Sequence, residues 1–265
     1  MIGIVHPGSM GSAVGAALRD GGHDVAWASR GRSAATARRA EAAGLVDLGT
    51  VERLADACDL IVSLCPPADA VSVAHAFVGY AGVYVDANAV SPDRSTHIEQ
   101  ALRSSTHMAE TLQPRPTYVA GAVVGPPPVE TGKTRLYLSG PHAERAASGL
   151  GNPRFDVRVL TSSDSAAKAL KMAYAAWTKG TAALLVAIRQ AARDLGVEAD
   201  LLEEWARSQP GLLARSEGAM EVAADRGWRW SFELDEIGRC FEAVGQPGGF
   251  GAAAAEVYAR FPRPD

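Results

Sequence analysis

The chain has 265 residues, a formal net charge of −4 and a composition that is 47% hydrophobic and 21% charged. These values are typical of an ordinary globular protein and exclude a mainly disordered chain. Because there is no basic stripe, no apolar run long enough for a bilayer and no signal-peptide pattern, we expect no nucleic-acid partner, no membrane partner and a cytoplasmic location.

The first part of the chain alternates short apolar runs with helical patterns. We expect strands over 2–5, 23–29, 59–65, 83–88, 117–125 and 134–140, with a short strand or loop over 45–49. We expect helices over 11–22, 33–44, 50–57 and 68–78. This alternation predicts right-handed βαβ units and a parallel sheet.

The pattern changes near residue 161, after which only helical periodicity is present. One helix without proline is expected over 165–191, followed by helices over 198–206, 211–225, 232–244 and 251–261. We therefore predict an α/β Rossmann-like domain over 1–160 and an all-α domain for substrate binding and dimerisation over 161–265. The apolar surface on the second half of the first long helix favours a homodimer.

The segment HPGSMGSAVG follows the first strand and resembles the glycine-rich loop that binds a dinucleotide phosphate. Gly8 and Gly11 occupy the second and third positions of G-x-G-x-x-G, while His6 stands at the first. The second glycine allows close approach of the backbone to phosphate, and the third allows the helix to pack on the strand. We predict cofactor contacts from Gly8, Ser9, Met10 and Gly11. A plain turn is the alternative, and His6 either packs beside Pro7 or tunes the loop.

The second strand ends in the segment SRGRS, where NAD-specific folds carry a carboxylate that binds the ribose. Here Ser29 takes that position, and Arg30 and Arg32 follow it. No carboxylate opposes a 2′-phosphate, and two guanidinium groups could pair with one. We therefore predict that the cofactor is NADP and that these three residues bind it. The alternative is that both arginines are simply solvated.

Further candidates follow the later strands. Cys65 and Pro66 end the third strand at the sheet edge where a dinucleotide would cross, so we predict that they contact the cofactor. Neither the three cysteines nor the six histidines have metal-ligand spacing, so we expect no disulfide and no metal site. Asn88 ends the strand expected over 83–88 and Ala89 follows it, and Val124 and Gly125 precede three prolines. We predict that these four residues contact the substrate.

A lysine near the start of the long helix is the candidate general acid and base. Lys171 shares one helix face with Tyr174, at i and i+3, on an otherwise apolar helix. Apolar surroundings lower the pKa of an ammonium group, which would suit proton transfer near neutral pH. Tyr174 is expected to orient Lys171 or the substrate. A lysine whose head group reaches solvent is the alternative.

Together these motifs resemble the β-hydroxyacid dehydrogenase superfamily, which includes 6-phosphogluconate and 3-hydroxyisobutyrate dehydrogenases. The resemblance covers nearly the whole chain. It rests on GIVHPGSMGSAV, SRGRS, VDANAVSP, GAVVGPPP and SAAKALKM. It is closest to a branch with a short, distinct C-terminal helical domain. The resemblance implies a Rossmann-like fold, NADP as cofactor and Lys171 as the catalytic lysine.

The sequence departs from that family at the positions that grip a substrate carboxylate. Asn88 and Val124 stand where the family has serines, and Ala175 replaces an asparagine four residues after the lysine. Ser165 and Ala167 replace two glycines before it. We therefore expect an NADP(H)-dependent oxidoreductase that interconverts a small hydroxy substrate, such as a hydroxyacid, and its carbonyl. An imine reductase is one alternative, and a non-catalytic NADPH-binding sensor or scaffold is another.

Overall fold

The computed structural model describes residues 1–104 and 116–263. The chain divides into two compact units, Met1–Lys171 and Met172–Asp265. None of the helices in the described residues combines the length and the apolar character that crossing a membrane requires.

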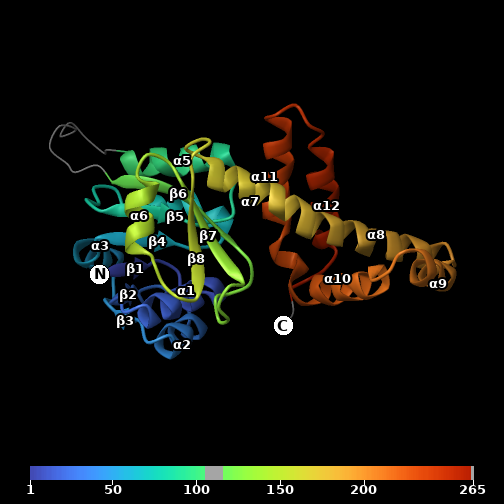
Figure 1. The fold of residues 1–265 in the computed structure, drawn as a ribbon, viewed down its shortest axis with the longest axis horizontal. Helices are drawn as coiled ribbons and strands as arrows, with labels where there is room; N and C mark the ends of the chain where they lie inside the picture. The colour runs from blue at the N-terminus through green and yellow to red at the C-terminus, as the bar shows by residue number, and fades with distance from the viewer. Residues whose placement is uncertain (105–115, 264–265) are drawn as a thin grey trace. The chain divides into compact units, whose positions relative to one another are not determined.

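The first unit is built on one eight-stranded sheet (Figure 1). Its strands run in the order β3-β2-β1-β4-β5-β6-β7-β8, and every neighbouring pair is parallel except β6 with β7. The strands are β1 Ile2–Ile4, β2 Val25–Trp27, β3 Val46–Asp47, β4 Leu60–Ser63, β5 Val83–Asp86, β6 Thr117–Val124, β7 Thr134–Ser139 and β8 Phe155–Leu160. The predicted Rossmann-like α/β fold is thus confirmed for this part of the chain.

Both faces of the sheet are covered, which explains why its central strands are continuous apolar runs rather than alternating ones. One face packs against α1 Ser9–Asp20, α2 Ala34–Ala42 and α6 Ala143–Gly149. The other packs against α3 Val51–Ala57, α4 Ala70–His75 and α5 Pro92–Arg103, with a short 3₁₀ turn at Pro67–Asp69 before α4. The result is a three-layer α/β/α unit.

Several elements were not predicted from the sequence. The strand β8 and the helices α5 and α6 are additional, and the sheet, which is otherwise parallel as expected, is antiparallel between β6 and β7. The loop from Gly125 to Lys133 joins these two strands directly, as only antiparallel neighbours allow. Gly125 has φ +114°, and a Cβ there would lie 2.2 Å from the carbonyl oxygen of Lys133, so this turn requires glycine.

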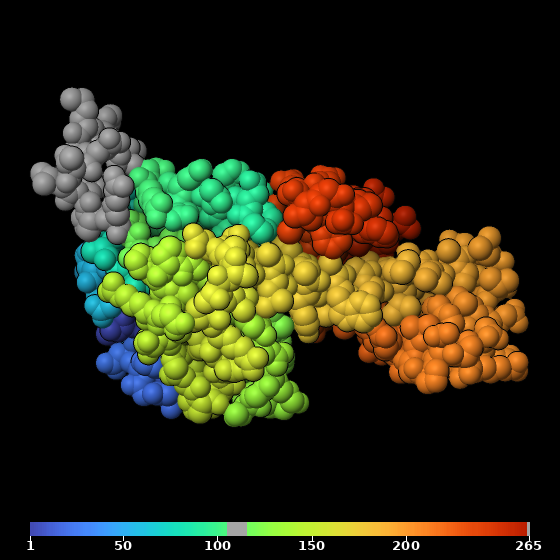
Figure 2. Space-filling view, turned by 45° about the horizontal axis from the view of Figure 1, so that its top comes forward, coloured from blue at the N-terminus to red at the C-terminus, as the bar shows by residue number. Residues whose placement is uncertain are grey.

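The second unit contains only helices among its described residues, as predicted. After α7 Ala166–Ala175, which begins in the first unit, they are α8 Thr181–Asp194, α9 Glu198–Ser208, α10 Leu212–Arg226, α11 Ser231–Glu242 and α12 Gly249–Ala259. The expected uninterrupted helix from 165 is interrupted by a π-helical segment, Ala176–Gly180. Figure 2 shows the red surface of the last helices lying along the amber surface of α8. Met172, Val186, Ile237 and Tyr258 lie in the core of this unit.

Candidate functional site

The strands β1 and β4 are neighbours in space but not in sequence, and the chain leaves them toward opposite sides of the sheet. In open α/β sheets, the carboxyl edge at such a switch point is where ligands bind. The predicted cofactor and substrate residues of the first unit lie at or just after the ends of the strands β1, β2, β4, β5 and β6, and Lys171 lies on α7. All of these strands are parallel, so their carboxyl ends meet at this one edge.

The loop after β1 is shaped by its glycines as the sequence suggested. A Cβ on Gly11 would lie 2.2 Å from the carbonyl oxygen of His6, so only glycine allows α1 to start this close to the strand. Gly8 is different, because its nearest neighbour would be the His6 ring at 3.9 Å, which leaves open space above the backbone. Ser9 and Met10 form the first turn of α1. The helix therefore presents its N-terminal N–H groups over an open glycine, a geometry that can accommodate phosphate.

The unusual His6 forms a specific contact with an arginine from the next βα turn. One terminal nitrogen of Arg32 lies 2.9 Å from His6 Nδ1, and the other donates to the carbonyl oxygen of Val5 at 3.4 Å. Burial lowers the pKa of His6, and the positive charge of Arg32 lowers it further. The imidazole is therefore neutral at pH 7 and accepts a hydrogen bond at Nδ1. His6 ties the first two βα turns together.

A separate pocket lies at the end of β2. It is lined by Ser29, Arg30, Gly49, Thr50, Glu52 and Arg53. The N–H of Arg30 donates to the carbonyl oxygen of Gly49 at 2.8 Å, which joins the turn after β2 to the turn before α3. Three residues were predicted to bind the 2′-phosphate of the ribose. Ser29 and Arg30 line this pocket, and Arg32 does not.

The third strand ends in a buried thiol. Burial raises the pKa of Cys65 to about 12, so it stays protonated and is a poor nucleophile at neutral pH. The Ser63 hydroxyl donates to its sulfur at 3.9 Å. Pro66 follows at the start of the 3₁₀ turn with φ −54°. Both residues thus lie at the carboxyl edge, where Cys65 packs into the core beneath the turn.

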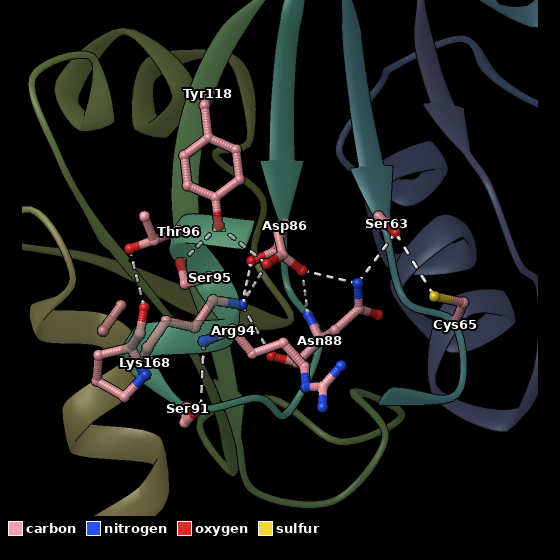
Figure 3. A network of polar contacts seen from close by, with 12 residues as sticks. Ser63, Cys65, Asp86, Asn88, Ser91, Arg94, Ser95, Thr96, Tyr118 and Lys168 are labelled. Carbon is pink, nitrogen blue, oxygen red and sulfur yellow. Dashed lines mark hydrogen bonds and ion pairs between the residues drawn. The ribbon is translucent and has the colours of Figure 1, made fainter. Parts of the chain in front are cut away.

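A buried ion pair lies at the end of β5 (Figure 3). Lys168 Nζ is 2.9 Å from Asp86 Oδ2 and also donates to the carbonyl oxygens of Asp86 at 2.7 Å and Asn88 at 2.8 Å. Both charged side chains are 0% exposed. The other Asp86 donors are the Tyr118 hydroxyl at 2.9 Å and the Asn88 backbone and side-chain N–H groups. Burial lowers the pKa of Lys168, whereas the negative charge of Asp86 raises it.

The orientation of Asn88 is fixed by these contacts. Its side-chain nitrogen donates to Asp86 Oδ1 at 2.7 Å and to the Ser63 hydroxyl at 3.1 Å (Figure 3). The residue is 2% exposed, and no described group donates to its Oδ1. Because a carboxylate can only accept, the amide cannot be turned the other way. Asn88 therefore retains an acceptor and no spare donor.

The remaining candidates are Lys171 and the residues predicted to contact the substrate. Its Nζ donates to the carbonyl oxygen of Val123 at 2.9 Å, and the side chain is partly buried. Val123 precedes Val124 and Gly125 at the end of β6, while Ala89 follows Asn88. The structure thus brings Lys171 to the end of β6. Tyr174 belongs to the second unit and is 42% exposed.

Sequence reasoning missed three residues of this region. Lys168 precedes Lys171 by one helical turn, and a second lysine on an apolar helix was a visible signal. Tyr118 is distant in sequence from Asp86, to which it donates, and Arg53 is distant from Arg30, with which it lines a pocket. No local sequence pattern therefore indicates either residue.

The fold and the site define a class: a Rossmann-like α/β unit, with candidate residues at the switch point of its sheet, followed by an all-helical unit. Residues 192–261 match a family model described as "Domain of unknown function (DUF1932)". No curated protein sequence matches the chain. The resemblance to β-hydroxyacid dehydrogenases is therefore tested by structural similarity.

Solved structures of hydroxyacid dehydrogenases and reductases have this fold over almost the whole chain. Mycobacterium tuberculosis 3-hydroxyisobutyrate dehydrogenase with L-serine has a TM-score of 0.71 at 17% identity, covering 98% of this chain and 92% of that one. The conserved protein MTH1747, described as structurally similar to 3-hydroxyacid dehydrogenases, has a TM-score of 0.68 at 23% identity, covering 98% and 95%. An Aspergillus terreus reductive aminase in complex with NADPH and ethyl levulinate has a TM-score of 0.59 at 16% identity, covering 98% and 92%. The resemblance is confirmed at the level of the fold.

Proposed function

We propose that the protein is an NADP(H)-dependent oxidoreductase that interconverts a small hydroxy substrate and its carbonyl. The observation that carries the proposal is the placement of Lys171 at the end of β6, in the same unit as the glycine loop after β1. The fit to a dinucleotide is supported by the open backbone at Gly8 and by the close approach that Gly11 permits. The fold shared with a reductive aminase that holds NADPH supports the same cofactor.

In this proposal, Gly8, Ser9, Met10 and Gly11 hold the pyrophosphate. When bound, the nicotinamide accepts or supplies the hydride. The chain's own part in the chemistry is the proton transfer. Neutral Lys171 takes the proton of the substrate hydroxyl during oxidation, and protonated Lys171 donates it to the carbonyl oxygen during reduction. The Val123 carbonyl holds Nζ in place by accepting from it. In the same proposal, Cys65 and Pro66 border the cofactor, and Ala89, Val124 and Gly125 contribute to the substrate site.

The replacement Lys171→Met tests the mechanism, with Arg145→Met as a control because Arg145 is an exposed cation on α6 at none of the proposed cofactor or substrate positions. A panel of short hydroxyacids with NADP, and of ketones and cyclic imines with NADPH, defines the activity. We expect Lys171→Met to lose about 10²–10⁴-fold in turnover and to retain NADPH affinity. Turnover within a few-fold of wild type would refute the role of Lys171. Tight NADPH binding without turnover of any compound in the wild type would favour a non-catalytic sensor.

The orientation of Asn88 favours imine reduction as the second candidate. Both amide hydrogens of Asn88 are used internally, and Val124 offers no side-chain donor. A carboxylate substrate needs donors at these positions, whereas an imine does not. Turnover of cyclic imines that exceeds turnover of hydroxyacids on the panel would select this candidate.

We also propose that the protein is a homodimer. The second unit has an apolar groove of about 640 Å³ between α8, α11 and α12. Leu184 and Phe250 line it and are 59% and 72% exposed. A contiguous apolar groove with exposed side chains is typical of a surface that another protein covers. Sedimentation should give a dimer that Leu184→Asp dissociates, and a wild-type monomer at micromolar concentration would refute the proposal.

A further inference from the structure

The turn after β2 carries two arginines that sequence reasoning treated alike, and the structure separates them. Arg30 lines the pocket at the end of β2. Arg32 is partly buried and directs its two terminal nitrogens to His6 and Val5 in the neighbouring turn. A guanidinium held in this way is not available to a ligand in the pocket.

A different arginine lines the pocket beside Arg30. Arg53 lies in the first turn of α3, where the Thr50 hydroxyl accepts a hydrogen bond from its backbone N–H at 3.3 Å. The side chains of Arg30 and Arg53 are exposed, and the described residues give neither an ion pair within 4.0 Å. Two arginines that line one hollow and form no ion pair with a described carboxylate provide an electrostatic site for an anion.

Among the described residues, Glu52 is the one acidic group that lines the pocket. The Thr50 hydroxyl holds the pKa of Glu52 below its usual value, and the charge of Arg30 lowers it slightly further. The carboxylate is therefore ionised at neutral pH. Two arginines and one glutamate leave the pocket with an excess of one positive charge. This balance favours a dianionic phosphate over the uncharged ribose hydroxyl that NAD presents.

We propose that Arg30 and Arg53, with Ser29 and Thr50, form the site for the 2′-phosphate of NADP, and that Arg53 takes the role that the sequence suggested for Arg32. This assignment rests on the proposed NADP-dependent function and adds the residue that determines cofactor choice. Arg32 is a positioning residue that holds His6 and thereby the glycine loop. The two guanidiniums reach the phosphate from different elements, Arg30 from the end of β2 and Arg53 from α3.

The test uses two small probes that carry no nicotinamide, adenosine 2′,5′-bisphosphate and adenosine 5′-monophosphate. Calorimetry on the full chain measures both affinities. Because the two probes differ only in the 2′-phosphate, the ratio of the affinities gives the contribution of that group to binding. The variants are Arg30→Met, Arg53→Met and Arg32→Met. Arg38→Met is the control for net charge, because Arg38 is an exposed arginine on α2 that does not line the pocket.

We expect the wild type to bind the bisphosphate more tightly, and Arg53→Met and Arg30→Met each to reduce the ratio by about 10-fold or more. Arg32→Met should weaken both probes by a similar factor and leave the ratio within about 3-fold, and Arg38→Met should change neither affinity. A ratio that falls with Arg32→Met and not with Arg53→Met would overturn the assignment.

A wild type that binds both probes equally would also overturn the assignment of a 2′-phosphate site. The proposed oxidoreductase function is tested by a different result, because it requires only that a nicotinamide dinucleotide binds and supports turnover. NADH-dependent turnover by a protein without preference for the bisphosphate would refute the 2′-phosphate site and leave the oxidoreductase chemistry intact.

Discussion

The Lys168 ammonium lies 2.9 Å from Asp86 Oδ2, and both side chains are completely buried at the carboxyl end of β5. The two residues are 82 positions apart in sequence. Lys168 has three oxygen acceptors, and Asp86 is satisfied by donors from Asn88 and Tyr118 as well. Because each of the three N–H bonds of the ammonium group has an acceptor, Lys168 fixes the start of α7 against β5 and takes no part in proton transfer.

This pair predicts a large effect of removing one partner. Lys168→Met keeps the length of the side chain but leaves the Asp86 carboxylate without its counter-charge in a dry site. We expect the free energy of unfolding of the first unit to fall by about 3–5 kcal/mol. Urea unfolding, together with hydrogen exchange of the β5 amides, measures this change in the free energy of unfolding.

The matched control is Lys133→Met, which removes a lysine from an exposed pair with Glu130. Exposed pairs contribute about 0–1 kcal/mol, so little change is expected there. If Lys168→Met lost no more than this control, the buried pair would not stabilise the first unit.

The two glycines of the loop after β1 should respond differently to alanine. At Gly11 a Cβ would collide with the carbonyl oxygen of His6, so Gly11→Ala should cost about 1–3 kcal/mol in the free energy of unfolding. Gly8 has negative φ and open space around it, so Gly8→Ala should leave stability nearly unchanged. If the loop binds a pyrophosphate, Gly8→Ala should still weaken NADPH binding. Thermal unfolding and NADPH titration of both variants separate packing from ligand contact, and equal stability losses would contradict this.

The neutral His6 predicts a dependence of stability on pH. Its pKa in the folded state lies below the ordinary value of 6.5, so the folded protein binds the proton more weakly than the unfolded chain does. The stability that His6 contributes is therefore present above about pH 6.5 and is lost as pH falls through the folded-state pKa. Arg32 and Arg39 oppose protonation of the ring, and Asp69 favours it.

The variant His6→Gln offers Arg32 an acceptor that does not titrate. Between pH 7.5 and pH 5, its melting temperature should fall less than that of the wild type. The control His97→Gln replaces an exposed histidine on α5 and should follow the wild type. A wild-type curve that runs parallel to that of His6→Gln would mean that His6 is not held neutral by this environment.

Much of the fold was predictable because it depends on local patterns. The apolar runs of β1, β4 and β5 identify strands buried on both faces, and the glycines after β1 identify a tight turn into a helix. The antiparallel pairing of β6 and β7 was not predicted. An apolar run indicates a buried strand but does not show whether the neighbouring strand runs parallel or antiparallel to it. The π-helical segment Ala176–Gly180 was missed for a similar reason, because its sequence is an ordinary helical one.

The sequence by itself determined which residues end the strands of the sheet, because strand ends and the turns after them are local features. Only the tertiary structure decided what each residue does there. In the folded protein, Arg32 contacts His6, and Arg53 lines the pocket together with Arg30. Lys168 is buried against Asp86, whereas Lys171 lies at the end of β6. These outcomes depend on contacts between distant segments. Two lysines or two arginines of equal charge differ only in which partners the folded chain brings to them.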